Sequence, residues 1–438
     1  MVQNNLKEPT YRPVSKSDRL HSMDVLRGVA LLGILMINIE FFAQPFEKLI
    51  NPSLSTDFVG LNYYIWLLKE LIYLGKMWSI FAILFGAGAF LLITRAEKRG
   101  MAAGIADIYY RRLFWLLLFA LIHAYLIWSG DILFFYAVVG LFLYPVRKLS
   151  VRGMFIAVAI LLILSTLMPY LDYKNDVSLH KQVTEINAIK EKGQELTEEQ
   201  TVIFEEWKIK DAFIHPDQET LQKKIETMSK GTYFEIIKSE KDWVRSGHTE
   251  WFYKKGFFGT LMMMILGMAL IKSGILSAKS KNRTYLMLMA LGYIIGFSLA
   301  IFRIRYSLAN NFSLLSFDLA GIVWQTEITA VALGHIGLIC LFCKSNILGW
   351  LKISLAAVGR MAFTNYIVQS LIGTFLYYSY GFGLYGAMAK TEQLWVVGAV
   401  WVFQLIASPI WLKYFRFGPM EWVWRSLTYW QRQPMIVK

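Results

Sequence analysis

The sequence predicts an all-α integral membrane protein, a bundle of about ten transmembrane helices with one extracytoplasmic helical insertion. Three observations support this fold class. Of the 438 residues, 56% are hydrophobic and only 17% are charged, and the mean hydropathy is +0.44. Apolar runs of about 18 residues or more, long enough to cross a bilayer, recur along the chain. Residues 172–250 are instead polar, with 17 acidic and 12 basic residues.

The apolar runs predict five spans on either side of this polar segment. A first membrane half covers residues 25–171 and a second half covers residues 251–412. A cytoplasmic segment, 1–24, is expected before the first half, and a cytoplasmic tail, 413–438, after the second. The ten expected spans lie near residues 25–43, 76–94, 113–129, 131–148, 154–171, 255–273, 285–303, 320–343, 353–378 and 394–412.

Lysine and arginine concentrate in alternate loops between these spans. A first cluster, before the first span, comprises Lys7, Arg12, Lys16 and Arg19. Because Lys and Arg collect in cytoplasmic loops, both termini are expected in the cytoplasm. The net charge of +14 follows from this topology and from attraction to anionic lipid headgroups, so membrane lipids rather than nucleic acid are the expected partners.

Residues 172–250 are expected outside the cytoplasm. The runs VTEINAIKEKGQEL and QETLQKKIETM have apolar residues three and four apart, which predicts short amphipathic helices. The segment is either a solvated cap or a lid and acceptor-binding surface over the outer mouth of the bundle.

The most informative polar residues are His123 and Asp131, because the surrounding residues 111–140 are otherwise apolar after Arg112. An ionisable group costs roughly 2.5–3.5 kcal/mol at the centre of a membrane helix, so such a residue is a candidate functional residue. His123 lies roughly 16 Å along its helix from Arg112, just outside the bilayer centre. Asp131 follows the Ser129-Gly130 turn, where it either caps the next helix or orients the imidazole of His123.

A basic group lies at the cytoplasmic ends of the first three spans. Arg27, three residues after Asp24, can be neutralised by it. Arg95, Arg111 and Arg112 bound the loop between the second and third spans. This loop either only sets the topology or holds the phosphates of a cytosolic nucleotide-like donor.

A second polar group is expected toward the outer side. Asn38 and Glu40 fall near the outer end of the first span, and Glu327 falls in the outer half of the eighth, so we expect them to face one cavity. Arg303 either extends to the membrane interface or pairs with a buried carboxylate. His335 is expected to have a packing role.

The segment VGRMAFTNYIVQS, residues 358–370, brings Arg360, Asn365 and Gln369 into a span. Such residues must hydrogen-bond across helices or line a wet cavity, which makes them candidate substrate-binding residues. Cys340 and Cys343 lack the partners of a four-ligand metal site, so no metal is expected. The sequence also lacks a Walker or GxGxxG phosphate loop and a GxSxG nucleophile motif.

Four segments, in this order, resemble the YeiB-type bacterial membrane proteins, and the match runs nearly end to end. They are DVLRGVALLGIL, RRL with HAYLIWSGDIL, VGRMAFTNYIVQS and FGPMEWVWRSLTY. The resemblance implies a multi-pass protein of the bacterial cytoplasmic membrane. Through the D-x-x-RG motif and the intramembrane histidine, that family is similar to a larger group of transmembrane acyltransferases that includes the lysosomal heparan glucosaminide acetyltransferase.

This wider similarity implies an acyl-CoA co-substrate bound from the cytoplasm, no bound cofactor, and an extracytoplasmic sugar or lipid acceptor. By this similarity, His123 matches the position of the catalytic residue in those acyltransferases. A neutral imidazole can act as base or as nucleophile in acyl transfer, with Asp131 orienting it. Asn38, Asn365 or Gln369 can stabilise the oxyanion.

Two other functions remain open. Five spans on each side of an insertion are also the arrangement of an inverted-repeat secondary transporter, in which His123, Glu327 and Arg360 would serve proton coupling or substrate binding. The other is that of a lipid- or quinone-binding membrane protein. A homodimer is left open.

Overall fold

The structure is a computed structural model that describes residues 20–437. The basic cluster Lys7, Arg12, Lys16 and Arg19 therefore lies outside the described residues. Over residues 20–437 all the extended secondary structure is helical, and the only β pairing is an isolated bridge between Phe415 and Ile436. The all-α prediction is confirmed for this part of the chain.

The first half of the chain is built around α1 (His21–Ala43), an apolar helix that is buried along nearly its whole length. It packs against helices from both halves, namely α4, α14, α15, α16 and α17. The helices that follow it are α2 (Phe46–Ile50), α3 (Gly60–Leu68), α4 (Lys76–Lys98), α5 (Ala102–Leu126), α6 (Leu133–Gly140) and α7 (Leu143–Val146), with a 3₁₀ turn η1 (Pro52–Leu54) and a π-helical turn η2 (Lys69–Tyr73).

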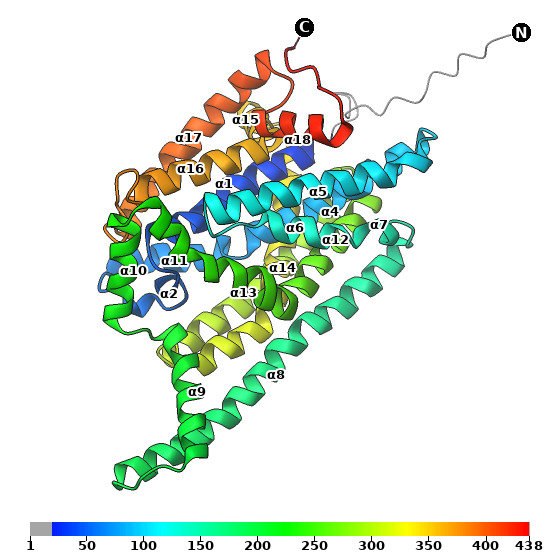
Figure 1. The fold of residues 1–438 in the computed structure, drawn as a ribbon. Helices are drawn as coiled ribbons and strands as arrows, with labels where there is room; N and C mark the ends of the chain where they lie inside the picture. Colours follow the sequence, from blue (N-terminus) through cyan, green and yellow to red (C-terminus); the bar gives the residue numbers. More distant parts are fainter. Residues whose placement is uncertain (1–19, 438) are drawn as a thin grey trace, which may run out of the picture.

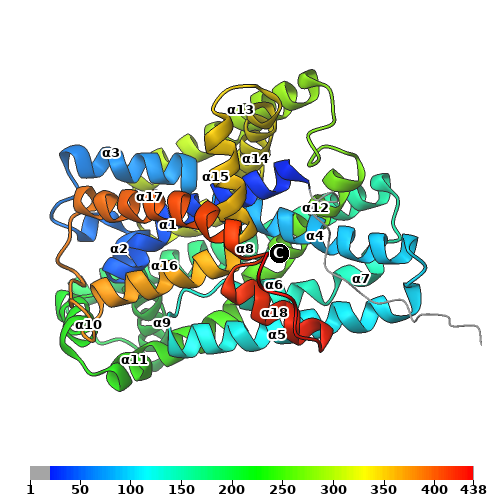
Figure 2. The ribbon, with the colours of Figure 1, turned by 90° about the horizontal axis from the view of Figure 1, so that it is seen from above.

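The rest of the chain contains the longest helices. These are α8 (Val151–Glu191), α9 (Glu198–Ile214), α10 (Gln218–Lys230), α11 (Tyr233–Ser246), the π-helical η3 (Gly247–Gly256), α12 (Phe257–Lys272), α13 (Asn282–Ala309), α14 (Leu314–Lys344), α15 (Gly349–Arg360), α16 (Ala362–Tyr377), α17 (Lys390–Tyr414) and α18 (Pro419–Tyr429). Figures 1 and 2 show α18 lying along α5, with which it is in contact.

The close crossing of α1 and α15 depends on two glycines. A Cβ on Gly28 would lie 2.0 Å from the carbonyl oxygen of Leu355, and one on Gly359 would lie 1.9 Å from the carbonyl oxygen of Asp24. Small residues allow helix backbones to approach each other in membranes. Gly28 belongs to the D-x-x-RG motif and Gly359 to VGRMAFTNYIVQS, so the two motifs meet at this crossing.

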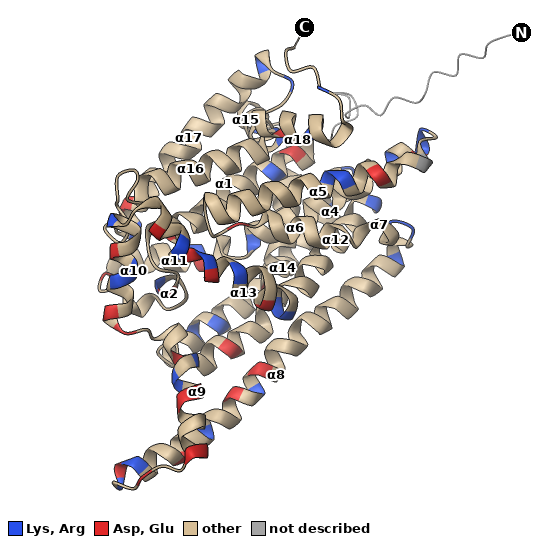
Figure 3. Cartoon of the chain, viewed as in Figure 1, with Lys and Arg blue, Asp and Glu red and all other residues tan. Residues whose placement is uncertain are grey.

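Seven helical segments over residues 20–437 are long and apolar enough to cross a membrane. They begin at His21, Gly60, Val151, Tyr233, Asn282, Leu314 and Lys390. The expected spans 113–129, 131–148 and 353–378 also fall on helices, but the second is divided between α6 and α7 and the third is broken at Met361. The several apolar helices indicate a multi-pass membrane protein. Figure 3 shows long charge-free stretches in α5, α8 and α17.

The polar segment differs in detail from the expectation. α8 continues past residue 171 without a break, so VTEINAIKEKGQEL forms the end of this helix and the following loop rather than a helix of its own. QETLQKKIETM does form a helix, α10. The first part of α8 packs against α12 and α14, and its far end projects from the bundle with α9 as an antiparallel pair, whereas α10 and α11 fold back onto the bundle (Figure 1).

The two ends of the bundle differ in character. We call the end formed by the start of α1, the end of α4, the start of α5 and α18 the basic end, because Arg27, Arg95, Arg112 and Arg425 lie there. The capped end is the opposite one, where α11 contacts the end of α5.

Candidate functional site

His123 and Asp131 are in direct contact inside the bundle. Nδ1 of His123 lies 2.8 Å from Oδ1 of Asp131. On the other side of the ring, Nε2 lies 2.9 Å from Oγ of Ser370, which comes from α16. The three side chains are buried, and His123 is only 1% exposed. An aspartate, a histidine and a serine are thus linked by two successive hydrogen bonds.

The position of Asp131 follows from how α5 ends. α5 stops at Leu126, and a short turn reverses the chain before α6 begins at Leu133. Asp131 lies in this turn, and its Oδ2 accepts a hydrogen bond of 2.8 Å from the backbone N–H of Phe134. The two roles expected for Asp131, a cap of the next helix and a partner of His123, are therefore combined in one carboxylate.

The hydrogen bond to Asp131 fixes the tautomer of His123. A carboxylate only accepts, so Nδ1 carries the proton and Nε2 of a neutral ring presents a lone pair. That lone pair accepts from the hydroxyl of Ser370, whose oxygen also lies 3.2 Å from the carbonyl oxygen of Tyr366. Ser370 was not singled out from the sequence, because it lies 247 residues from His123 and no local motif links the two.

Two aromatic rings enclose His123. The centroid of the Tyr366 ring lies 5.0 Å from that of the imidazole. The centroid of Trp128 lies 6.2 Å away, and Trp128 packs in turn on Phe42. The imidazole therefore sits in an aromatic enclosure that excludes bulk water.

A cavity of about 320 Å³ lies on the basic side of Tyr366. Its volume falls in the lower part of the range for small-molecule sites. Its charged lining is dominated by arginine, and it extends inward to Tyr366 and Ile132, next to the His123–Asp131 pair. The arginines that line it are Arg27, Arg95, Arg112, Arg360 and Arg425.

Two carboxylates also line this cavity, and both already have partners. Asp24 forms an ion pair of 2.8 Å with Arg27, as its spacing predicted. Glu421 accepts hydrogen bonds from the backbone N–H groups of Phe363 and Thr364 at the start of α16, with N···O distances of 2.7 and 3.3 Å. Five guanidinium groups against two carboxylates leave an excess of positive charge, which favours an anionic ligand.

The expected donor-binding arginines are only partly brought together. Arg27, Arg95 and Arg112 line the cavity, and the guanidinium of Arg112 lies 3.7 Å from the centre of the Trp424 ring. Arg111 does not line it. Its side chain pairs with Asp107 and donates to the carbonyl oxygen of Thr428 at 3.2 Å. Consecutive residues of a helix point in different directions, so one arginine of the pair faces the cavity and the other does not.

Arg360 is separated from Asn365 and Gln369, with which the sequence grouped it. It lines the cavity at the basic end. Asn365 donates to Oγ of Ser408 at 3.0 Å, and Gln369 donates to Oε1 of Gln404 at 2.9 Å. The two amides therefore bridge α16 and α17, which is the first of the two arrangements expected for them.

Glu40 belongs to a buried ion cluster near the capped end. Its carboxylate lies 2.6 Å from Nζ of Lys69 and 2.7 Å from Nζ of Lys390. All three side chains are buried. Asn38, two residues earlier on α1, is half-buried. Neither Asn38 nor Glu40 lines the cavity described above.

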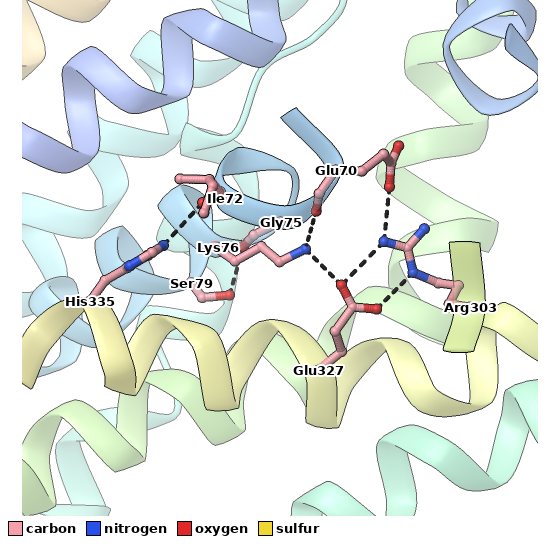
Figure 4. Close-up of polar contacts among 8 residues, drawn as sticks. All are labelled: Glu70, Ile72, Gly75, Lys76, Ser79, Arg303, Glu327 and His335. Carbon is pink, nitrogen blue, oxygen red and sulfur yellow. Dashed lines mark hydrogen bonds and ion pairs between the residues drawn. The ribbon is translucent and has the colours of Figure 1, made fainter. Parts of the chain in front are cut away.

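Glu327 belongs to a different ion cluster, shown in Figure 4. Its carboxylate lies 2.6 Å from Nζ of Lys76 and 2.7 Å from Nε of Arg303. Arg303 also pairs with Glu70 at 2.8 Å, so it pairs with buried carboxylates rather than extending to an interface. The expectation that Glu40 and Glu327 face one cavity is wrong, because internal cations on different helices hold each carboxylate in its own cluster.

His335 has the packing role expected for it. Its Nε2 lies 3.0 Å from the carbonyl oxygen of Ile72, and its Nδ1 lies 2.9 Å from the hydroxyl of Tyr293 (Figure 4 shows the first contact). Both ring nitrogens are satisfied within the protein. Over residues 20–437, no group of three or more His, Cys, Asp or Glu side chains could hold a metal ion.

At the capped end, α11 covers the turn that carries Asp131. Tyr233 donates to the carbonyl oxygen of Leu126 at 2.6 Å, and Ser129 donates to the carboxylate of Glu240 at 2.6 Å. Tyr233 and Glu240 belong to α11. The polar segment is thus hydrogen-bonded to the site on the side opposite the arginine-lined cavity.

The chain is similar to bacterial proteins whose function is undescribed. A family model described as "Protein of unknown function (DUF418)" matches residues 270–431. The chain is 30% identical to the "Uncharacterized protein YxaH" of Bacillus subtilis (strain 168), over 98% of each chain. It is also 30% identical to the "Uncharacterized protein YeiB" of Escherichia coli (strain K12), over 96% of this chain and 99% of that one. No solved structure matches it.

Proposed function

The chain belongs to the DUF418 family of uncharacterised bacterial proteins, and on that premise we propose that it is a transmembrane acyltransferase. It transfers an acyl group from cytoplasmic acyl-CoA to an extracytoplasmic sugar or lipid acceptor. The observation that carries this proposal is the line of Asp131, His123 and Ser370 next to an arginine-lined cavity. The basic end faces the cytoplasm in this proposal, and ten helical spans cross the membrane.

The cavity suits a phosphate-bearing donor. Guanidinium groups bind phosphate through paired, charge-assisted hydrogen bonds, and five of them line this space. Trp424, beside Arg112, adds an aromatic face on which a purine can stack. Acyl-coenzyme A carries both phosphates and adenine. In this proposal, its arm with the thioester points inward toward Tyr366.

His123 is suited to be the general base. Acyl transfer to a hydroxyl or amine needs a group that removes a proton from the attacking atom. Asp131 holds Nδ1–H, so Nε2 is free of a proton and already accepts from an alcohol at 2.9 Å. The surrounding aromatic rings exclude water, which would otherwise hydrolyse the thioester.

The acceptor approaches from the capped end in this proposal. α11 is hydrogen-bonded to the turn between α5 and α6, and Trp128 of that turn packs near His123. Movement of α11 would uncover the route to the imidazole. The polar segment then acts as a lid rather than as a passive cap.

The first experiment measures transfer from labelled acetyl-CoA by purified protein in liposomes, with glucosamine and a bacterial lipid extract as acceptor probes. We expect labelled product from the natural chain and none from His123→Ala. His180→Ala, a change of an exposed residue in the far part of α8, is the matched control and should retain activity. Equal product from His123→Ala and the natural chain contradicts the proposal.

A proton-coupled transporter is the second candidate, favoured by the buried ion clusters. Lys69 and Glu70 are consecutive residues of the π-helical turn η2, yet Lys69 pairs in the Glu40 cluster and Glu70 in the Glu327 cluster. Rows of charged side chains within membrane helices often form proton relays, and π-helical turns occur at functional sites. This function predicts solute movement under an imposed proton gradient without a covalent product.

A further inference from the structure

We propose that Ser370 is the nucleophile of the reaction and carries the acyl group as an ester between donor and acceptor. This inference rests on the acyl transfer proposed above. Asp131, His123 and Ser370 are joined by contacts of 2.8 and 2.9 Å in the order carboxylate, imidazole, hydroxyl. This is the arrangement of a nucleophilic serine, which is recognised by geometry and not by sequence position.

The alternative role of a helical serine is to bond to the backbone carbonyl four residues earlier. Ser229 and Thr260 do so here, with O···O distances of 2.7 and 2.8 Å. The distance from Oγ of Ser370 to the carbonyl oxygen of Tyr366 is 3.2 Å, whereas the distance from the same Oγ to Nε2 of His123 is 2.9 Å. The nearer partner of the Ser370 hydroxyl is therefore the imidazole, which is the group that can take its proton.

Ser370 lies directly beyond the end of the cavity. Tyr366, which lines the cavity, precedes Ser370 by four residues on α16, so the two side chains lie on one face of the helix. The separation along the helix axis is about 6 Å, from a rise of about 1.5 Å per residue. The Tyr366 ring lines the cavity, and its centroid lies 5.0 Å from that of the imidazole, so its displacement would let a thioester carbonyl reach Ser370.

The loading step conserves atoms, protons and charge. Oγ of Ser370 attacks the thioester carbonyl carbon while its proton passes to Nε2 of His123. The C–S bond breaks, and the departing thiolate takes the proton from Nε2 to give free coenzyme A and an acyl ester on Ser370. Asp131 stabilises the transient imidazolium through Nδ1–H.

The unloading step repeats this chemistry with the acceptor. The hydroxyl or amine of the acceptor gives a proton to Nε2 and attacks the ester carbonyl. The C–Oγ bond breaks, and Oγ takes the proton back, which restores Ser370. Because Ser370 is 1% exposed, water reaches the ester poorly in the interval. The ester allows coenzyme A to leave the basic end before the acceptor enters from the capped end.

The test is to incubate purified protein with labelled acetyl-CoA in the absence of acceptor. We expect stoichiometric release of coenzyme A and label on the peptide that contains Ser370, stable to denaturation and removed by mild base. Ser370→Ala and His123→Ala should give no such label, and Ser370→Ala should lower the transfer rate at least about 100-fold, as does loss of the nucleophile in other serine enzymes. Ser370→Cys should carry the label as a thioester that hydroxylamine removes. Ser316→Ala, another buried helical serine, should label like the natural chain.

The outcomes separate this inference from the proposed function. If the natural chain transfers acetyl groups and Ser370→Ala does so at a similar rate, Ser370 is not the nucleophile and only this inference is overturned. This inference is also overturned if the natural chain transfers acetyl groups when both substrates are present but releases no coenzyme A when the acceptor is absent. If the natural chain transfers nothing to any probe and takes no label, both proposals fail. Thermal unfolding of each variant identifies a loss of fold.

Discussion

Asp131 binds His123 through one carboxylate oxygen and caps α6 through the other. Oδ1 lies 2.8 Å from Nδ1 of His123, and Oδ2 accepts from the backbone N–H of Phe134 at 2.8 Å. The helix that begins beside His123 therefore holds the carboxylate that orients it. A side chain used in this way has little rotational freedom, so the imidazole is held in one tautomer and one orientation before any substrate arrives.

Asp131→Asn should separate these two roles. The amide oxygen can still cap α6, since asparagine is as good a cap as aspartate, but it no longer holds the imidazolium. We expect the fold to persist and the transfer rate to fall by about 10²–10⁴-fold, as when the carboxylate of a catalytic triad becomes an amide. The measurements are initial rates with acetyl-CoA and thermal unfolding. A rate within twofold of the natural chain would mean that Asp131 serves only as a cap.

Arg112→Ala should weaken binding of coenzyme A, and Arg111→Ala should not. The two residues are neighbours on α5, but only Arg112 lines the cavity. Loss of one charge-assisted contact is worth about 1.5–3 kcal/mol, which corresponds to about a tenfold or larger rise in Kd. The Kd is measured at two salt concentrations by titrating each variant with coenzyme A and monitoring tryptophan fluorescence. Equal effects of the two substitutions would place the donor elsewhere.

Gly28→Ala should destabilise the bundle, because the added Cβ would lie 2.0 Å from the carbonyl oxygen of Leu355. Forcing the backbones of α1 and α15 apart should cost about 1–3 kcal/mol or more. Gly398→Ala on α17 is the control, since nothing lies within 4 Å of a Cβ there. Thermal unfolding in detergent should show a lower midpoint for Gly28→Ala alone. Equal midpoints would show that the two helices can separate at little cost.

Glu327→Gln should be strongly destabilising. The substitution leaves Arg303 paired with the carboxylate of Glu70, whereas Lys76 keeps its hydrogen bond of 2.6 Å to the backbone carbonyl oxygen of Glu70 (Figure 4). Removing one member of a buried ion pair costs about 3–5 kcal/mol, whereas replacing both members by apolar residues is often neutral. The double change Lys76→Met with Glu327→Leu should therefore recover much of the thermal stability.

The same two variants test the transporter. If the double variant is stable and transfers acetyl groups at the natural rate, the cluster is structural. A stable double variant that has lost proton-driven solute movement would instead assign the cluster to transport. Solute flux and acetyl transfer are measured on the same liposome preparation.

The sequence was most informative where the physical constraint is local. Apolar runs predicted the helices because a membrane segment must satisfy its backbone hydrogen bonds within itself. The spacing of Asp24 and Arg27 predicted their ion pair, and the position of Asp131 after a turn predicted its cap. The pairing of Arg303 with a buried carboxylate was one of two options, and only the structure selected it.

Errors arose where residues were grouped by depth alone. Glu40 and Glu327 are at similar predicted depths but lie in separate clusters, because depth along a helix does not give the direction of a side chain. Side-chain direction also separates Arg111 from Arg112, whereas Arg360 is separated from Asn365 because the helix breaks at Met361, between α15 and α16. Tyr366, Arg425 and Ser370 were missed because each becomes informative only through a neighbour on another helix.

The sequence by itself determined the all-helical character of the chain, its apolar segments, its polar insertion and its family, since these follow from composition, periodicity and motif order within one chain. Only the tertiary structure decided which polar side chains meet. His123 and Ser370 lie 247 residues apart and contact each other because α5 and α16 pack in one bundle. That packing depends on side-chain fit between helices distant in sequence, which no local pattern records.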